Sequence, residues 1–178
     1  MTEHQFSNFS SYEFEILCLD LLNEEYRLNI KTDHDLSKNL LQFNTSKAGK
    51  DGGIDLYYNH DGVKVIGQVK HSSGNFADLF RILKKSNSSQ TEVEKVRKQN
   101  PNKYLFMTSV PLSVANKQVL TEHFAPYIKS DVDIYGRDDL NRLLAQFKHV
   151  ERRHVKLYFT NPTVIEHLSA AATVSRQV

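Results

Sequence analysis

Three side chains in two neighbouring segments have the types needed for metal-assisted hydrolysis of a phosphodiester. Asp55 follows a glycine-rich run, residues 49–54, and Gln68 and Lys70 lie two apart in the segment 65–70. Such hydrolysis requires neutralisation of the phosphate charge and a water made nucleophilic. Mg²⁺ (or Mn²⁺) supplies both, and Mg²⁺ prefers carboxylate, carbonyl and water oxygens as ligands. The sequence therefore indicates a metal-dependent phosphodiesterase centre.

Each residue of this centre has an expected role. Asp55 is the main carboxylate ligand, and the Gln68 amide oxygen and the Val69 backbone carbonyl are further ligands. Gln68 and Lys70 point to the same face of a strand because side chains alternate along it. Lys70 would orient or deprotonate the attacking water, or hold the phosphate. Glu15 is expected as an outer carboxylate, in direct contact with the metal or through water.

Two strands must position these groups. Alternating side chains predict them at residues 54–58 and 63–70, joined by a turn that contains Asp61 and Gly62. On the first strand we expect one face to carry Ile54, Leu56 and Tyr58, and the other Asp55 and Tyr57.

The alternative to a catalytic centre is the solvent face of an edge hairpin. Asp55 and Lys70 would then form a surface ion pair that contributes little stability. Against this, a half-buried polar strand face beside Asp55 needs a partner. Spacing alone does not decide between the two interpretations.

The first helix is predicted after Ser10, which forms a capping box with Glu13. Its apolar stripe has helical spacing and indicates a buried face, formed by Phe14, Leu17, Cys18, Leu21 and Leu22. Cys18 is therefore expected to be a core residue, and Glu15 to lie on the rim of the stripe.

The other elements complete an α/β domain with a mixed central sheet flanked by helices. We expect a short edge strand at 26–31, an irregular segment at 32–50, helix at 75–100 with a break at 86–89, a buried strand at 104–110, helix at 112–129, a strand at 132–135, and helices at 138–147 and 163–172. Residues 1–160 form the predicted domain, and 161–178 a helix and the start of a linker.

Composition is that of a globular domain, since 39% of the 178 residues are hydrophobic and 25% charged. The net charge of +2 neither requires nor excludes a nucleic-acid partner. The single cysteine rules out an internal disulfide. We expect no secretory leader and no membrane span, and a cytoplasmic location.

Three segments together resemble the Mrr-like branch of the PD-(D/E)xK restriction-endonuclease superfamily. They are residues 14–17 with Leu21 and Leu22, residues 49–55, and residues 68–70. The resemblance implies a restriction-endonuclease-like core and Mg²⁺-dependent cleavage of DNA. It also implies an active site made of Asp55, Gln68 and Lys70 with Glu15 in support. Gln68 stands where most of the superfamily has a carboxylate.

Segments 108–112, 138–141 and 149–151 are similar to nuclease modules that precede STAND-type NTPases in antiphage defence. This similarity implies an effector domain of a longer protein, activated as a homo-oligomer, with an NTPase domain on its C-terminal side. Two alternatives stay open: a catalytically inactive nucleic-acid-binding or assembly module, and a junction-resolving nuclease.

DNA-phosphate contacts are expected from cations that surround the centre: Lys47, Lys50, His71, Arg81, Lys84 and Lys85. For each of them, a solvated surface charge is the alternative. Asp51 is interpreted as a turn residue rather than a second acid.

Overall fold

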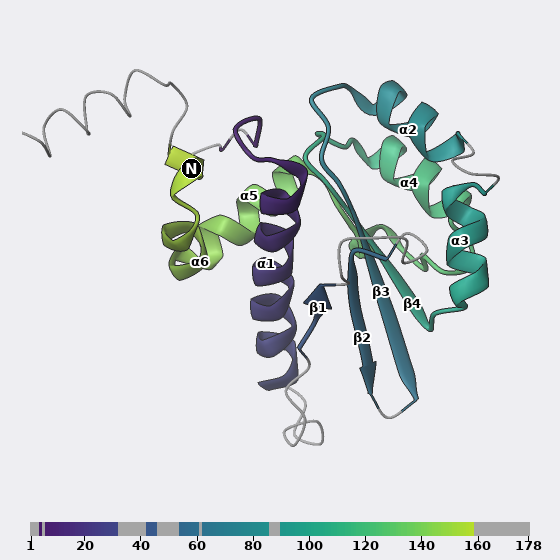
Figure 1. The fold of residues 1–178 in the computed structure, drawn as a ribbon, viewed down its shortest axis with the longest axis horizontal. Helices are drawn as coiled ribbons and strands as arrows, with labels where there is room; N and C mark the ends of the chain where they lie inside the picture. Colours follow the sequence, from purple (N-terminus) through teal and green to yellow (C-terminus); the bar gives the residue numbers. More distant parts are fainter. Residues whose placement is uncertain are drawn as a thin grey trace, which may run out of the picture.

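The computed structural model describes residues 4, 6–31, 42–45, 54–60, 62–85 and 90–158. In these ranges a five-stranded mixed sheet forms in the order β1-β2-β3-β4-β5 (Figure 1). The strands are β1 (Asn44–Thr45), β2 (Leu56–His60), β3 (Val63–Lys70), β4 (Lys103–Thr108) and β5 (Ile134–Tyr135). The β1–β2 and β2–β3 pairs are antiparallel, and β3–β4 and β4–β5 are parallel.

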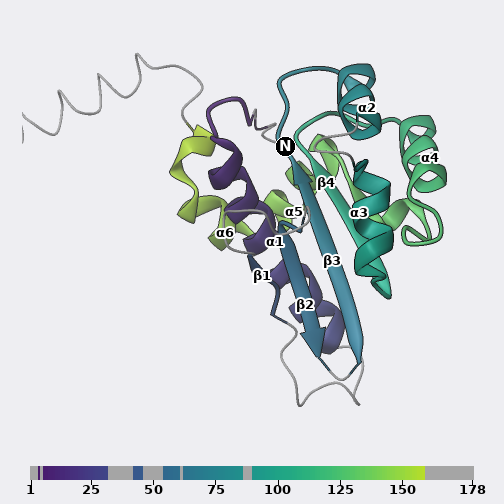
Figure 2. The same cartoon turned by 45° about the vertical axis from the view of Figure 1, so that its right-hand side comes forward.

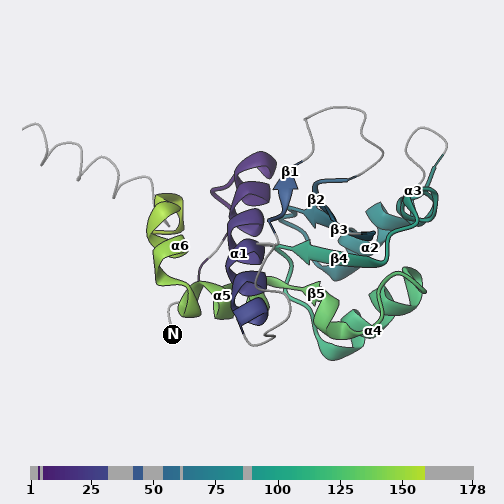
Figure 3. The same cartoon turned by 90° about the horizontal axis from the view of Figure 1, so that it is seen from below.

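Helices cover both faces of the sheet (Figures 1 and 3). One face packs against α1 (Ser11–Lys31), α5 (Arg137–Gln146) and α6 (Lys148–Arg153), and the other against α2 (Phe76–Lys84), α3 (Glu92–Gln99) and α4 (Val114–His123). Two short 3₁₀ helices are η1 (Asp131–Asp133) and η2 (Val155–Tyr158). The expected α/β architecture with a mixed sheet flanked by helices is confirmed.

Helix α1 begins as its sequence predicts. The Glu13 carboxylate accepts from the Ser10 backbone N–H at 2.9 Å, and the Glu13 N–H donates to the Ser10 hydroxyl at 3.3 Å. The whole predicted stripe, Cys18 included, is buried. The edge strand expected at 26–31 is wrong, because α1 continues to Lys31. Tyr26, four residues after Leu22, extends the apolar stripe and packs on Phe43 with ring centroids 5.0 Å apart.

The β2–β3 hairpin is the longest antiparallel unit of the sheet (Figure 2). Strand β2 begins at Leu56 rather than Ile54, because the chain bends at Asp55. The expected common face of Ile54 and Leu56 is therefore wrong: Leu56 packs toward α1, and Ile54 toward α2 and α3. Gly67 is paired with Leu56, whose Cβ lies 3.1 Å from where a Cβ on Gly67 would be. The glycine thus allows β2 to approach β3 closely.

In the second half of the chain, β4 and α5 lie within two residues of the predicted elements, whereas β5 is shorter than predicted and α6 was not predicted. Helices α2 and α3 replace the expected broken helix, and the break at 86–89 lies outside the described residues. Helix α4 ends at His123, earlier than expected, and a turn with a cis Ala125–Pro126 bond follows. The helix expected at 163–172 also lies outside the described residues. Within the described ranges, no helix combines the length and apolar character needed to cross a bilayer.

Candidate active site

Asp55 is fixed against β3 by its backbone and its carboxylate. Its N–H donates to the Gly67 carbonyl at 3.2 Å. Its Oδ2 accepts from the Val69 backbone N–H at 2.7 Å and from the Gln68 side-chain amide. One carboxylate oxygen therefore joins the bend before β2 to two successive residues of β3.

The backbone carbonyl of Val69 points to the side of β3 on which Asp55 lies. Within a strand, the N–H and C=O of one residue point to the same side, and successive residues alternate. The Lys70 carbonyl accepts from the Ser109 N–H at 3.4 Å and the Thr108 hydroxyl at 2.8 Å, which places it on the β4 side. The Val69 N–H points away from β4 and donates to Asp55. The Val69 carbonyl therefore also points away from β4, to the Asp55 side.

Gln68 is the most deeply buried polar residue of the centre, with 1% of its surface exposed. Its amide nitrogen binds Asp55, while its Oε1 is buried and has no hydrogen-bond partner among the described residues. A buried acceptor without a partner is costly. An oxygen ligand for a cation is one use for such an atom.

Glu15 approaches from α1, on the opposite side of the sheet from α2 and α3. Burial raises the pKa of its carboxyl to about 7, and the negative charge of Asp55 adds to the shift. Burial also raises the pKa of Asp55, against the Val69 N–H and the Lys70 charge, which lower it. The charges of Glu15 and Lys70 therefore interact with that of Asp55, and Gln68 and Val69 bind Asp55 directly, so these five residues form one group.

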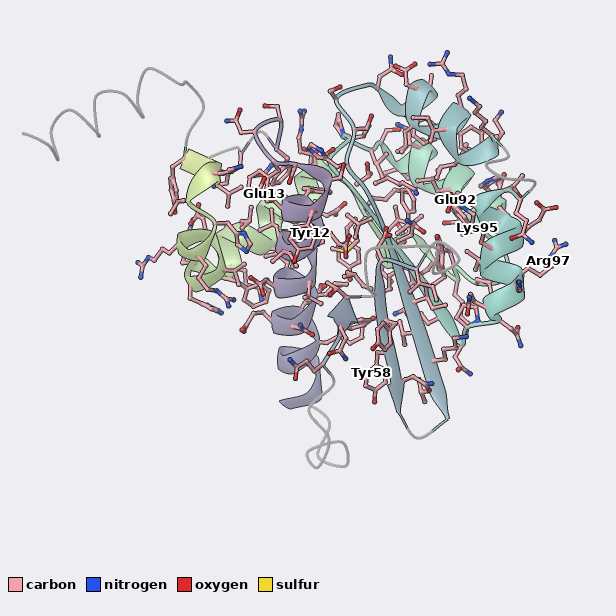
Figure 4. The ribbon with its side chains drawn as sticks, in the orientation of Figure 1. Tyr12, Glu13, Tyr58, Glu92, Lys95 and Arg97 are labelled. Atoms are coloured by element: carbon pink, nitrogen blue, oxygen red, sulfur yellow. The ribbon has the colours of Figure 1, made fainter. Side chains whose placement is uncertain are left out.

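Two charged residues beside this group, Glu92 and Lys95, were not predicted from the sequence. Glu92, on α3, has an Oε1 that lies 3.7 Å from Lys70 Nζ and 2.9 Å from Lys95 Nζ. Figure 4 shows Glu92 and Lys95 on the sheet side of α3 and Arg97 on its outer side. A sequence signal existed: Glu92 lies four residues before the buried Val96, and hence on the same helix face.

The predicted DNA contacts are distributed unevenly. Arg81, Lys84 and Lys85 are exposed at the end of α2; Arg81 pairs with Asp78 at 2.8 Å and Lys84 lies over the Phe80 ring. Lys47 and Lys50, together with Asp51, lie outside the described residues.

His71 is on the α1 side of the sheet, opposite Lys70. Its ring packs on Phe14 with centroids 5.0 Å apart, and its Nε2 is 2.9 Å from the Phe6 carbonyl. It also lines a pocket of about 160 Å³ at the ends of β3 and β4. Ser109 braces this region, because its hydroxyl accepts from the Ser72 N–H and donates to the Ser72 carbonyl.

The donor set suits a hard cation, since it consists of carboxylate, amide and carbonyl oxygens. In the described part of the chain, no three or more His, Cys, Asp or Glu side chains form a cluster that would hold a metal by themselves. A cation here would therefore rely on the Gln68 amide and the Val69 carbonyl beside Asp55.

Comparisons with known proteins leave the family open. No protein-family model matches, and no solved structure matches. A similar curated protein is the "Uncharacterized protein y4cD" of Sinorhizobium fredii, 29% identical over 167 residues, or 93% of this chain. The chain spans 23% of that protein's length.

Proposed function

We propose that this chain is a Mg²⁺- or Mn²⁺-dependent DNA endonuclease domain with a restriction-endonuclease-like core. The observation that carries the proposal is the convergence of the Asp55 carboxylate, the Gln68 amide and the Val69 backbone, with Lys70 next along the strand. Sequence resemblance to the Mrr-like branch and the mixed sheet with flanking helices support it.

The residues present fit a bound cation, because Gln68 Oε1 is buried and has no hydrogen-bond partner in the part of the chain that the structure describes. Asp55, Gln68 and the Val69 carbonyl would hold it, with Glu15 as an outer carboxylate. The bound ion supplies charge neutralisation at the phosphate and a more acidic water. Gln68 contributes no charge, so Asp55 carries most of the electrostatic attraction for the metal.

Lys70 and Glu15 would serve the reaction from opposite sides of the sheet. Lys70 offers an ammonium group to a phosphate oxygen or to the attacking water. Glu15 has a pKa of about 7 in the metal-free protein, and a bound cation would lower that pKa and favour the charged form expected of an outer carboxylate. In the hydrolysis, the water oxygen bonds to phosphorus and gives up a proton, the P–O bond to one sugar breaks, and the leaving oxygen gains a proton.

The chain is further proposed to act as a module of a longer, oligomeric defence protein. Its limited share of the length of the Sinorhizobium fredii protein supports a multidomain context. Restriction-type cleavage of both strands needs two active sites, which a homo-oligomer would provide.

Cleavage of supercoiled, linear and branched DNA with Mg²⁺ or Mn²⁺ tests the function. Asp55→Asn retains an oxygen able to accept from both Gln68 and Val69, so it removes the charge and keeps the geometry. We expect Asp55→Asn and Lys70→Met each to reduce cleavage by at least about a hundredfold. The exposed Asp138→Asn is the matched control.

Equal cleavage by Asp55→Asn and wild type would refute the active-site assignment. Salt-sensitive DNA binding without cleavage, even in a forced dimer, would favour the inactive binding module. Preference for branched over linear DNA would favour the junction-resolving nuclease.

A further inference from the structure

Glu92 is a buried carboxylate at the start of α3. Only 5% of its surface is exposed. Thr91 caps the helix through its hydroxyl, which accepts from the Glu94 N–H, and Glu94 accepts from the Thr91 N–H at 2.6 Å. This capping box sets where α3 begins, and therefore where Glu92 lies relative to β3.

Two lysines from different elements share one oxygen of Glu92. Lys95 Nζ, one helical turn away, lies 2.9 Å from Oε1, and Lys70 Nζ, on β3, lies 3.7 Å from the same atom. The other oxygen, Oε2, is buried without a hydrogen-bond partner among the described residues. A buried carboxylate is tolerated when cations compensate it.

An ordinary ion pair within α3 explains only part of this arrangement. Pairs three residues apart on a helix surface contribute little and are usually exposed. Glu92 instead faces inward, and its second partner is the lysine two residues after Gln68. Among the described residues, Glu92 is the carboxylate within 4.0 Å of Lys70.

We propose that Glu92 is a positioning residue that holds the Lys70 ammonium in place beside Asp55 and Gln68. This inference rests on the nuclease function proposed above. A lysine side chain has a flexible four-carbon stem, so its ammonium needs a fixed partner to occupy one position. Glu92 supplies that partner from a capped helix.

In the proposed scheme Lys70 offers its ammonium to a phosphate oxygen, and Glu92 sets the position of that ammonium. Glu92 touches neither the phosphate nor the reacting water in this scheme, and acts only through Lys70.

The test compares Glu92→Gln with Glu94→Gln, the same change two residues along the same helix, by two readouts. The first is the mobility of Lys70, measured by ¹³C relaxation at Cε without DNA or metal. In Glu92→Gln we expect the order parameter of Lys70 to fall to that of the exposed Lys85.

The second readout is steady-state cleavage, where kcat should fall by about tenfold to a hundredfold with KM for DNA unchanged. Glu94→Gln should change neither, because the Gln amide oxygen can still accept from the Thr91 N–H and keep the capping box.

Lys95→Met tests whether Glu92 serves only in the ion pair with Lys95 within α3. The variant removes that pair and leaves the contact between Glu92 and Lys70 intact. We expect Lys70 to stay ordered and kcat to stay close to wild type. If Glu92→Gln fails to fold, Glu92→Asp, which withdraws the carboxylate by one methylene, carries the same test.

Unchanged order at Lys70 in folded Glu92→Gln would overturn the positioning role. So would a loss of order in Lys95→Met as large as in Glu92→Gln. Absence of cleavage by the wild type under every condition would refute the nuclease function instead, while the relaxation data would still decide whether Glu92 holds Lys70.

Discussion

Replacement of Glu15 by Gln should stabilise the metal-free protein at alkaline pH. The pKa of Glu15 is raised in the folded state, so the folded protein binds this proton more tightly than the unfolded chain does. Stability must therefore fall as pH rises from about 4.5 to about 7. Gln cannot ionise, so the variant loses this dependence.

The magnitude follows from the two pKa values. The carboxyl shifts from its ordinary 4.5 to about 7, through burial first and Asp55 second. At about 1.4 kcal/mol per tenfold change in proton affinity, the upper bound is about 3.4 kcal/mol. Glu15 is only half-buried, and solvent screening reduces the expected gain to about 1–2 kcal/mol.

Urea unfolding of both proteins with a chelator present, from about pH 2 to about pH 8, measures the effect. The curves should coincide at the acidic end and separate as pH rises. Glu13→Gln is a control of opposite sign, because bonds from Lys156 and Ser10 lower the Glu13 pKa to about 2. Its stability deficit should be present above about pH 5 and vanish as pH falls toward 2. Equal or lower stability of Glu15→Gln at about pH 8 would refute the reasoning.

Two further predictions concern the hairpin and the DNA surface. Gly67→Val would place a side chain against Leu56, whose Cβ lies 3.1 Å from the position that the new Cβ would occupy, and should cost about 1–3 kcal/mol in urea unfolding; unchanged stability would mean that β2 has room to move. Removal of Arg81, Lys84 or Lys85 should each reduce the slope of log binding constant against log salt by about one if that residue contacts a DNA phosphate. Unaltered slopes would remove α2 from the DNA interface.

Much of the fold was predictable because local signals agree with the tertiary structure. The capping box and apolar stripe located α1, and alternation with a turn signal located the hairpin. The wrong edge strand at 26–31 arose because a short weak alternation competes poorly with a helix that continues to bury Tyr26. Hydrophobic pattern alone does not mark where such a helix stops.

The candidate site was only partly predictable for a different reason. Asp55, Gln68 and Lys70 belong to one hairpin, so their spacing carries information about their contacts. Glu92 comes from α3, and its position depends on how α3 packs on β3, which a sequence pattern does not specify. The sequence also did not reveal the bend at Asp55 that puts Ile54 and Leu56 on different faces of the sheet. This bend follows from hydrogen bonds to Gly67 and Val69.

The local character of the hairpin has a consequence for folding kinetics. Asp55 binds Gln68 and Val69 across only 13 and 14 residues, whereas the bond from Thr108 to Lys70 spans 38. Short loops close at lower entropic cost, and hairpins form faster than parallel pairings. We therefore expect Asp55 and Gln68 to meet while the core is still open to water. Repulsion between Asp55 and Glu15 arises later, when α1 docks, so alkaline pH should slow the docking of α1 and leave hairpin formation unchanged.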